Sequence, residues 1–265
     1  MNLEKRILNI VDLGLIDYFK SYKLQEELVE LRKQDKISDT LLIAQHPFEI
    51  NFGSNKKDNL LNDFYQKELI SIHGDNYGYE DIKKYLESKN IKFSVSKRGG
   101  GATVLAPGQL VFYPIVDLKK LFNTNDTVSK LDVYKNLIDK VMYDALKNNS
   151  LTDIYIAKGY NKELGRDRRD VWVDIDDKHY KIGSKGIVMT KNIAYHGFVL
   201  YLDKEGTKNF DIVKPCGYDH DEVSVISVEE VLNEKVSINK VKSDVINSIK
   251  HHFNYEEISK ANKYL

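Results

Sequence analysis

Apolar side chains recur every three to four residues in several parts of the chain, which is the spacing of one face of an α-helix. The first such segment covers residues 17–34, where Tyr18, Tyr22, Leu28 and Leu31 fall on roughly one face. This spacing predicts an amphipathic helix near the start of the chain. Further helices are predicted over residues 79–89, 128–147 and 239–253.

The two longest later helices each have an apolar face. In residues 128–147, Val133, Leu137, Val141 and Ala145 repeat at helical spacing and are expected to face the core. Residues 255–265 are expected to extend the last helix or to fray. The side chains of that helix expected to point inward are Val241, Val245, Ile249 and Phe253.

Continuous apolar runs predict buried strands over residues 40–45 and 109–116. Polar stretches follow Phe52 and cover residues 123–126, and both are predicted to be loops. The order of elements indicates an α/β (α+β) fold, a mixed β-sheet flanked by helices. Other strands are predicted over residues 7–11, 91–95, 153–158, 171–174, 179–182, 187–190 and 194–202, with a hairpin closed by residues 176–178 and a helix-capping box at Ser227–Glu230.

Composition narrows the class of protein without naming it. The 265 residues suit one large α/β domain or two small ones, and the formal net charge is zero. The overall charge therefore gives no reason to expect nucleic acid or an anionic membrane as a partner. No apolar run of about 18 residues predicts a membrane span, and the first residues do not lead into a signal-peptide block. The single cysteine excludes an intrachain disulfide and fits a reducing compartment.

A turn of three glycines, Gly99 to Gly101, precedes the predicted strand 109–116 and follows Arg98. Glycines let another molecule approach the backbone closely, and a planar guanidinium can hold a carboxylate or phosphate. The turn is therefore a candidate ligand cradle, and the alternative is a tight hairpin corner without a ligand. It is neither a P-loop nor a dinucleotide-binding turn, because no Gly-Lys-Ser/Thr follows and a strand, not a helix, comes next.

Cys216 is the first candidate for covalent chemistry. It lies between Pro215 and Gly217, on a turn where a thiol can meet a substrate, whereas a lone cysteine is otherwise an inert buried residue. A reactive thiol needs a nearby cation or base, because an unperturbed thiol is only a few per cent thiolate at neutral pH. Lys181 is the candidate cation, Lys185 is its rival, and a solvated lysine at a hairpin end is the alternative for either.

Histidines supply further candidates. His196 is a candidate acid–base or orienting group, or else a hydrogen-bonded structural residue. His220 is close to Cys216 in sequence, so a Cys–His pair is possible. His251 and His252 point to different faces of a helix and are poor metal ligands. No spacing of histidines and carboxylates predicts a metal site, and no cofactor is predicted.

Several motifs in order give the chain a resemblance to the octanoyl-[acyl-carrier-protein]:protein octanoyltransferases, which make the first transfer in lipoate biosynthesis. The similarity covers roughly residues 7 to 230, and a set of ordered motifs is more specific than any one of them. The motifs are Gln45-His46-Pro47 with Phe52-Gly53, Arg98-Gly99-Gly100 with Thr103, Pro107-Gly108-Gln109 with Tyr113-Pro114, Val171-Trp172-Val173, Lys181-Ile182-Gly183-Ser184 with Gly186, His196-Gly197-Phe198, and Pro215-Cys216-Gly217.

The resemblance implies the fold of biotin and lipoate protein ligases, a mixed sheet flanked by helices. It implies that Cys216 takes the octanoyl chain as a thioester and that Lys181 lowers the pKa of the thiol and handles protons, as a neighbouring ammonium group can. The acyl enzyme would then be attacked by a lysine of a lipoyl domain. The resemblance assigns substrate binding to Arg98, Gly99, Gly100, Gly101, Ala102, Thr103, Val104, Leu105, Ser184, Lys185, Gly186, His196, Gly197, Phe198 and Val199.

The chain departs from the family pattern at a few positions. Leu105 and Ala106 replace the usual His-Gly, Gln45 replaces a glutamate, and Lys185 adds a second charge close to Lys181. An apolar Leu105 removes a hydrogen-bonding group, which can alter the preference for chain or head group. Two alternatives therefore stay open: an ATP-dependent lipoate or octanoate ligase of the same fold, and a non-catalytic binder of acyl carrier or lipoyl domains.

The resemblance also implies the partners of the protein. The donor would be acyl carrier protein, and the acceptors would be lipoyl domains of 2-oxoacid dehydrogenases or the glycine cleavage H protein. We expect a cytoplasmic monomer that binds no nucleic acid and no membrane. The catalytic domain is predicted over residues 1–230, with a C-terminal helical extension over residues 231–265 packed on it.

Overall fold

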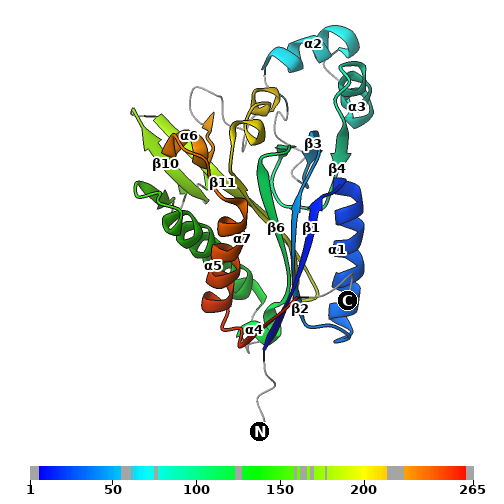
Figure 1. Cartoon of the computed structure of the whole chain (residues 1–265). Helices are drawn as coiled ribbons and strands as arrows, with labels where there is room; N and C mark the ends of the chain where they lie inside the picture. The colour runs from blue at the N-terminus through cyan, green and yellow to red at the C-terminus, as the bar shows by residue number, and fades with distance from the viewer. Residues whose placement is uncertain are drawn as a thin grey trace.

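The computed structural model describes residues 6–54, 61, 63–74, 77–122, 127–157, 160–161, 166–167, 170–176, 178–213 and 224–260. Its centre is a nine-stranded mixed sheet with the strand order β14-β1-β2-β6-β12-β11-β10-β7 and with β13 paired to β11 (Figure 1). The pairs β1–β14, β1–β2 and β11–β13 are parallel and the remaining pairs are antiparallel. The predicted mixed α/β fold is confirmed. The strands are β1 (Ile7–Leu15), β2 (Asp39–Gln45), β6 (Gln109–Asp117), β7 (Ile154–Ile156), β10 (Val171–Ile175), β11 (Lys178–Thr190), β12 (Ile193–Tyr201), β13 (Ser224–Val225) and β14 (Glu257–Lys260).

The central strands are apolar throughout because helices cover both faces of the sheet. In β6, Leu110 and Phe112 pack toward α5 (Thr127–Asn148) and α7 (Ile238–His252), while Val111 and Tyr113 pack toward α1 (Tyr18–Lys33). Figure 1 shows α5 and α7 on one side of the sheet and α1 on the other. Alternation along a strand thus sends successive residues into two separate cores.

A second sheet, β4-β3-β5, stands beside the main one. It consists of β3 (Glu49–Phe52), β4 (Phe93–Val95) and β5 (Ala102–Leu105), and it has its own apolar core around Ile50 and Phe52. The helices α2 (Asp63–His73) and α3 (Tyr79–Ser88) lie at this end of the molecule (Figure 1). The remaining short elements are α4 (Leu118–Phe122), α6 (Val228–Leu232), η1 (Lys204–Gly206), η2 (Phe210–Ile212), β8 (Tyr160–Asn161) and β9 (Arg166–Asp167).

Most predicted elements are present, and the differences have physical reasons. The capping box at Ser227 and Glu230 forms as predicted. Val133 was expected in the core but is 43% exposed. The buried face of α5 is instead formed by neighbours such as Tyr134 and Ile138, because their rotation about the helix axis points them at the sheet. Helix α2 follows the polar stretch that was predicted to be a loop.

The end of the chain also differs from the expectation of a continued helix. Residues Glu257–Lys260 form strand β14, which pairs in parallel with β1. Helix α7 packs against α5 through Val241, Val245 and Ile249, so residues in the predicted C-terminal extension complete both the core and the sheet. The boundary at residue 230 stays a prediction.

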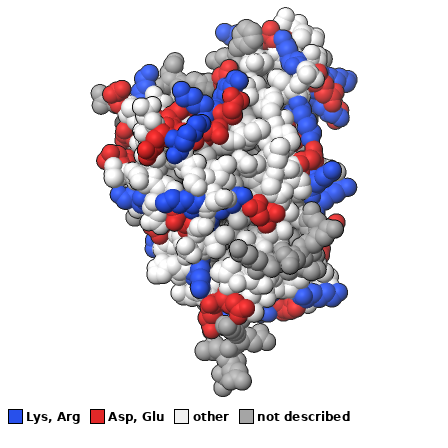
Figure 2. All heavy atoms as spheres, viewed as in Figure 1, with Lys and Arg blue, Asp and Glu red and all other residues white. Residues whose placement is uncertain are grey.

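Within the described residues, no helix has the length and apolar content that a membrane span needs. On the viewed face, lysine and arginine side chains are interspersed with aspartate and glutamate (Figure 2). This face therefore shows no extended area of a single charge.

Candidate functional site

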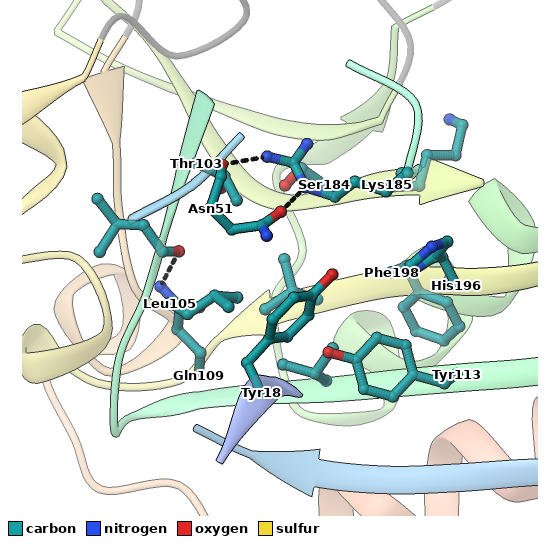
Figure 3. Close-up of a pocket in the computed structure, with 16 residues that line it drawn as sticks. Tyr18, Asn51, Thr103, Leu105, Gln109, Tyr113, Ser184, Lys185, His196 and Phe198 are labelled. Atoms are coloured by element: carbon teal, nitrogen blue, oxygen red, sulfur yellow. Dashed lines mark hydrogen bonds between the residues drawn. The ribbon is translucent and has the colours of Figure 1, made fainter. Parts of the chain in front are cut away.

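A pocket opens where the core of the small sheet meets the core beneath α1 (Figure 3). It contains about 500 Å³ of empty space, part of which is open to solvent. One part of its wall is aliphatic and the rest carries hydroxyl, amide and imidazole groups. The wall consists of Tyr18, Asn51, Arg98, Thr103, Val104, Leu105, Gln109, Val111, Tyr113, Ser184, Lys185, Gly186, His196, Gly197, Phe198 and Val199.

Eleven of the fifteen residues that the resemblance assigns to substrate binding line this pocket. They come from three separate segments, on β5, β11 and β12, with Arg98 just before β5. Gly99, Gly100, Gly101 and Ala102 do not line it. The glycine turn packs closely against the backbone of strand β11. A Cβ atom on Gly99 would lie only 3.1 Å from the carbonyl oxygen of Ile187.

Arg98 holds the glycine turn in place. Its Nε donates to Asn51 Oδ1 at 2.6 Å, and its NH2 group donates to the carbonyls of Asn51 at 2.6 Å and Gly101 at 2.7 Å. A further bond runs from NH1 to the carbonyl of Gly99. The sequence suggested that this guanidinium could hold an anion, but in the structure most of its donors are used by the protein itself. Its positive charge still reaches the pocket wall.

The pocket residues that the sequence did not assign to the site are Tyr18, Asn51, Gln109, Val111 and Tyr113. Gln109 and Tyr113 nevertheless belong to the family motifs, which was the available signal for them. Tyr18 was predicted on the apolar face of a helix and Val111 within a buried strand. Only the folded structure shows that both side chains border a cavity. Asn51 is fully buried and also accepts a hydrogen bond from Ser96 at 3.0 Å. Its position directly before the Phe52-Gly53 motif was the available signal for it.

Three buried polar atoms of the pocket residues have no hydrogen-bond partner in the described part of the chain: Tyr18 Oη, Gln109 Oε1 and His196 Nε2. Figure 3 shows the Tyr18 hydroxyl pointing toward the middle of the labelled side chains. Buried polar groups are ordinarily satisfied by protein, water or ligand. Three such atoms around one cavity are expected where a ligand with polar groups binds.

His196 is neutral near physiological pH. Burial, with the charges of Arg98 and Lys97, lowers its pKa to about 3. Its ring stacks on Tyr22 and Tyr195, with centroids 5.5 and 4.9 Å apart. A neutral imidazole cannot act as a proton donor at neutral pH in the way an imidazolium does, so of the two predicted roles the geometry favours orientation.

His46 and Tyr113 support the pocket from below α1. His46 Nε2 lies 2.7 Å from Tyr113 Oη and its Nδ1 lies 2.7 Å from the carbonyl oxygen of Ile16. Burial lowers the pKa of His46 and raises the pKa of Tyr113 well above its usual range. The pair is thus a neutral, hydrogen-bonded support that fixes the Tyr113 ring in the pocket wall.

Lys181 does not line this pocket and lies in a buried cluster of charges beside it. Its Nζ is 2.9 Å from Asp170 Oδ2 and 4.9 Å from the centroid of the Trp172 ring. Both Lys181 and Asp170 are buried. The solvated hairpin-end alternative is therefore excluded for this lysine.

Lys185 joins the same cluster through the other oxygen of Asp170. Its Nζ is 3.2 Å from Asp170 Oδ1 and pairs with Asp139 on α5, and its backbone N–H donates to Asp170 Oδ1 at 3.1 Å. Asp170 has a φ of +100°, a backbone conformation that costs a non-glycine residue about 1–3 kcal/mol. One strained aspartate therefore contacts both lysines.

Cys216 and His220 lie outside the described residues, so their predicted roles stay predictions. His252 pairs with Asp144 at 2.6 Å. Within the described ranges, no group of three or more histidine, cysteine, aspartate or glutamate residues is arranged to hold a metal ion.

The mixed sheet thus carries a pocket with aliphatic and polar walls, and a buried lysine cluster lies beside it. The lipoyl protein ligase A/B catalytic domain model matches residues 17–250, and the chain belongs to this family. The chain is 31% identical to the mitochondrial octanoyltransferase LIP2 of Arabidopsis thaliana, covering 87% of this chain and 86% of that protein. It is also 31% identical to the octanoyltransferase of Caldicellulosiruptor saccharolyticus, covering 88% and 83%. The chain is an enzyme of the acyltransferase class.

Among solved structures, a bipartite lipoate protein ligase from Thermoplasma acidophilum, studied with its E2 lipoyl domain, has a TM-score of 0.63. It is 14% identical in sequence and covers 99% of this chain and 87% of that one. At this identity the likeness concerns the fold alone, and it confirms the predicted biotin/lipoate ligase-like architecture.

Proposed function

We propose that this enzyme transfers an octanoyl or lipoyl group from acyl carrier protein to a lysine of a lipoyl domain or H protein in the cytoplasm, through a thioester on Cys216. The observation that carries the proposal is the pocket. Its aliphatic wall, with Val104, Leu105, Val111 and Val199, suits a medium-length acyl chain. The unpaired polar atoms of Tyr18 and His196 suit the carbonyl end.

The reaction divides into two acyl transfers. The thiolate of Cys216 attacks the carbonyl carbon of the octanoyl group, the bond from that carbon to the carrier sulfur breaks, and the carrier leaves as a thiol after taking up a proton. The amine of the acceptor lysine then attacks the same carbon. The bond from that carbon to the Cys216 sulfur breaks, which restores the thiolate, and the nitrogen loses one proton as the amide forms.

Lys181 is the residue proposed to favour the thiolate of Cys216. A buried ammonium group close to a thiol stabilises its charged form and lowers its pKa. The position of Lys181 on a strand, paired with Asp170 and covered by Trp172, gives it a fixed geometry. A cation that is already fixed stabilises a negative charge more effectively than a cation that must be ordered during the reaction.

Intact-protein mass spectrometry tests the covalent step directly. The protein is mixed with octanoyl-loaded acyl carrier protein, beside the Cys216→Ser variant. The expected result is an octanoyl adduct on the wild type alone, released by hydroxylamine as a thioester should be. An adduct of equal yield on the serine variant, or none on either, would reject the proposal.

The same samples distinguish the ligase alternative. With ATP, free lipoate and a lipoyl domain, an ATP-dependent ligase would modify the acceptor without acyl carrier protein and without Cys216. The sequence relatives at 31% identity are octanoyltransferases, which favours transfer from a carrier. We therefore expect no modification under ligase conditions.

A further inference from the structure

We propose that Asp170 is the positioning residue of Lys181, and that Lys185 with Asp139 holds Asp170 in place for this task. The inference rests on the proposed function, because it concerns how Lys181 acts on Cys216. Neither Asp170 nor Asp139 belongs to the motifs that relate the chain to the octanoyltransferases.

The first line of support is the geometry of the carboxylate. Each oxygen of Asp170 serves a different lysine: Oδ2 accepts from Lys181 Nζ at 2.9 Å, and Oδ1 accepts from Lys185 N at 3.1 Å and lies 3.2 Å from Lys185 Nζ. The backbone contact to Lys185 fixes the carboxylate relative to β11 itself. Lys181 lies on the same strand, so its ammonium position follows from that of Asp170.

The second line of support is the backbone of Asp170. Its φ of +100° lies in a region where glycine is the residue without strain. Strained backbone persists where the surrounding contacts over-determine it. Here those contacts include the two lysines and a hydrogen bond of 3.3 Å from Ala157 N to the Asp170 carbonyl. The contacts of its carboxylate with Lys181 and Lys185 explain why an aspartate, and not a glycine, occupies this position.

The third line of support is the balance of charge around Lys181. Among the described residues, the charged groups whose contacts link them to Lys181 include Asp170, Lys185 and, paired with Lys185 from α5, Asp139. Two buried ammonium groups that share one carboxylate would repel each other. Asp139 offsets the charge of Lys185, which leaves one oxygen of Asp170 to Lys181. Loss of the Asp170 carboxylate would favour neutral Lys181 through burial and through like charge, and a neutral amine does not stabilise a thiolate.

The test follows the alkylation of Cys216 by iodoacetamide as a function of pH, which requires neither carrier nor acceptor. Asp170→Asn keeps the shape of the side chain, and asparagine tolerates positive φ. The expected result is an alkylation profile shifted to higher pH by about one unit, with the rate at pH 7 lowered by up to about tenfold. An unchanged profile, or a shift to lower pH, would overturn the inference.

Two further variants separate positioning from other causes. Asp170→Gly removes the carboxylate while relieving the backbone, so it should fold and show the same upward shift; a wild-type profile in this variant counts against the inference. Asp139→Asn removes an equal charge at the far lysine and should shift the profile by less than half as much. An equal shift in Asp139→Asn would mean that the net charge of the cluster decides, and the inference would fail.

The acyl-adduct measurement distinguishes this failure from failure of the proposed function. If the wild type forms no hydroxylamine-labile octanoyl adduct, the proposed function itself is wrong and the inference falls with it. If the wild type forms the adduct while both Asp170 variants keep its alkylation profile and adduct rate, the function stands and only the positioning role of Asp170 is rejected.

Discussion

Arg98 and Lys181 are two cations beside the same pocket, and the protein holds them in different ways. The guanidinium of Arg98 donates to neutral oxygens of Asn51, Gly99 and Gly101. Lys181 pairs with the carboxylate of Asp170, in a buried cluster that also contains Lys185 and Asp139. Both arrangements fix a cation: the described contacts of Arg98 include these neutral acceptors, and those of Lys181 include a carboxylate.

The difference determines how far each charge acts. Burial is the main cause of the lowered pKa of His196, and the charge of Arg98 adds to it. A cation paired with a carboxylate acts over a shorter distance, because the two fields largely cancel beyond the pair. The charge of Arg98 thus reaches another residue of the pocket wall, whereas Lys181 acts most strongly on a group that comes very close to it. A thiol brought close to Lys181 would be such a group.

The largest expected effect comes from removing the paired cation. Lys181→Met should lower octanoyl transfer at least about 100-fold, since the thiolate loses its activating charge. Stability should fall by about 2–3 kcal/mol, less than for a lone buried pair, because Asp170 keeps Lys185. Single-turnover kinetics and urea unfolding measure the two quantities. Transfer within threefold of wild type would remove Lys181 from the mechanism.

Replacing Arg98 should first of all reduce the stability of the fold. In Arg98→Lys, one ammonium group cannot replace the planar set of donors to Asn51 and Gly101, so unfolding should cost about 3 kcal/mol less. Lys97→Met is the matched control, since the Lys97 side chain is 69% exposed and should change stability by less than about 0.5 kcal/mol. Equal losses in urea unfolding for the two variants would contradict the role given to Arg98.

The pH dependence of stability reports on the burial of His196 and, to a smaller extent, on the charge of Arg98. The pKa of His196 is about 3 in the folded protein and about 6.5 when unfolded, so between these values the unfolded state binds more protons. The stability from this residue is complete above pH 6.5 and falls as the pH falls. Between pH 7 and pH 5 the loss should be about 2 kcal/mol.

His196→Asn isolates this part of the pH dependence, because asparagine tolerates the φ of +56° at this position. The variant should lose about 2 kcal/mol less than the wild type between pH 7 and pH 5 in urea unfolding. His46, whose pKa is also lowered, contributes equally in both proteins. The same pH slope in variant and wild type would show that His196 is not held neutral.

The smallest expected effect concerns the pocket hydroxyls. Tyr18→Phe removes a buried hydroxyl without a partner in the described chain, so stability should change little while transfer falls about three- to tenfold. In Tyr113→Phe the lost hydroxyl is bonded to His46, and stability should fall by about 1 kcal/mol. If Tyr18→Phe lost stability and kept full transfer, its hydroxyl would have no part in binding.

The sequence by itself determined the local elements and the family. Helical spacing placed α1 and α7, the continuous apolar run placed β6, and the Ser227–Glu230 box placed the start of α6. These features depend on residues within a few positions of one another, which a linear pattern contains. The ordered motifs likewise brought together Thr103, Ser184 and His196 as one expected site, and the pocket lines all three.

Tertiary structure decided which faces meet. Val133 and Tyr134 are adjacent in sequence, but the rotation of α5 against the sheet exposes one and buries the other. The pairing of β14 with β1 joins residues about 250 positions apart, and the Asp170–Lys181 and Asp139–Lys185 pairs depend on how β10, β11 and α5 pack. No periodicity in the sequence encodes such contacts, because they depend on long-range geometry and on desolvation in the folded state.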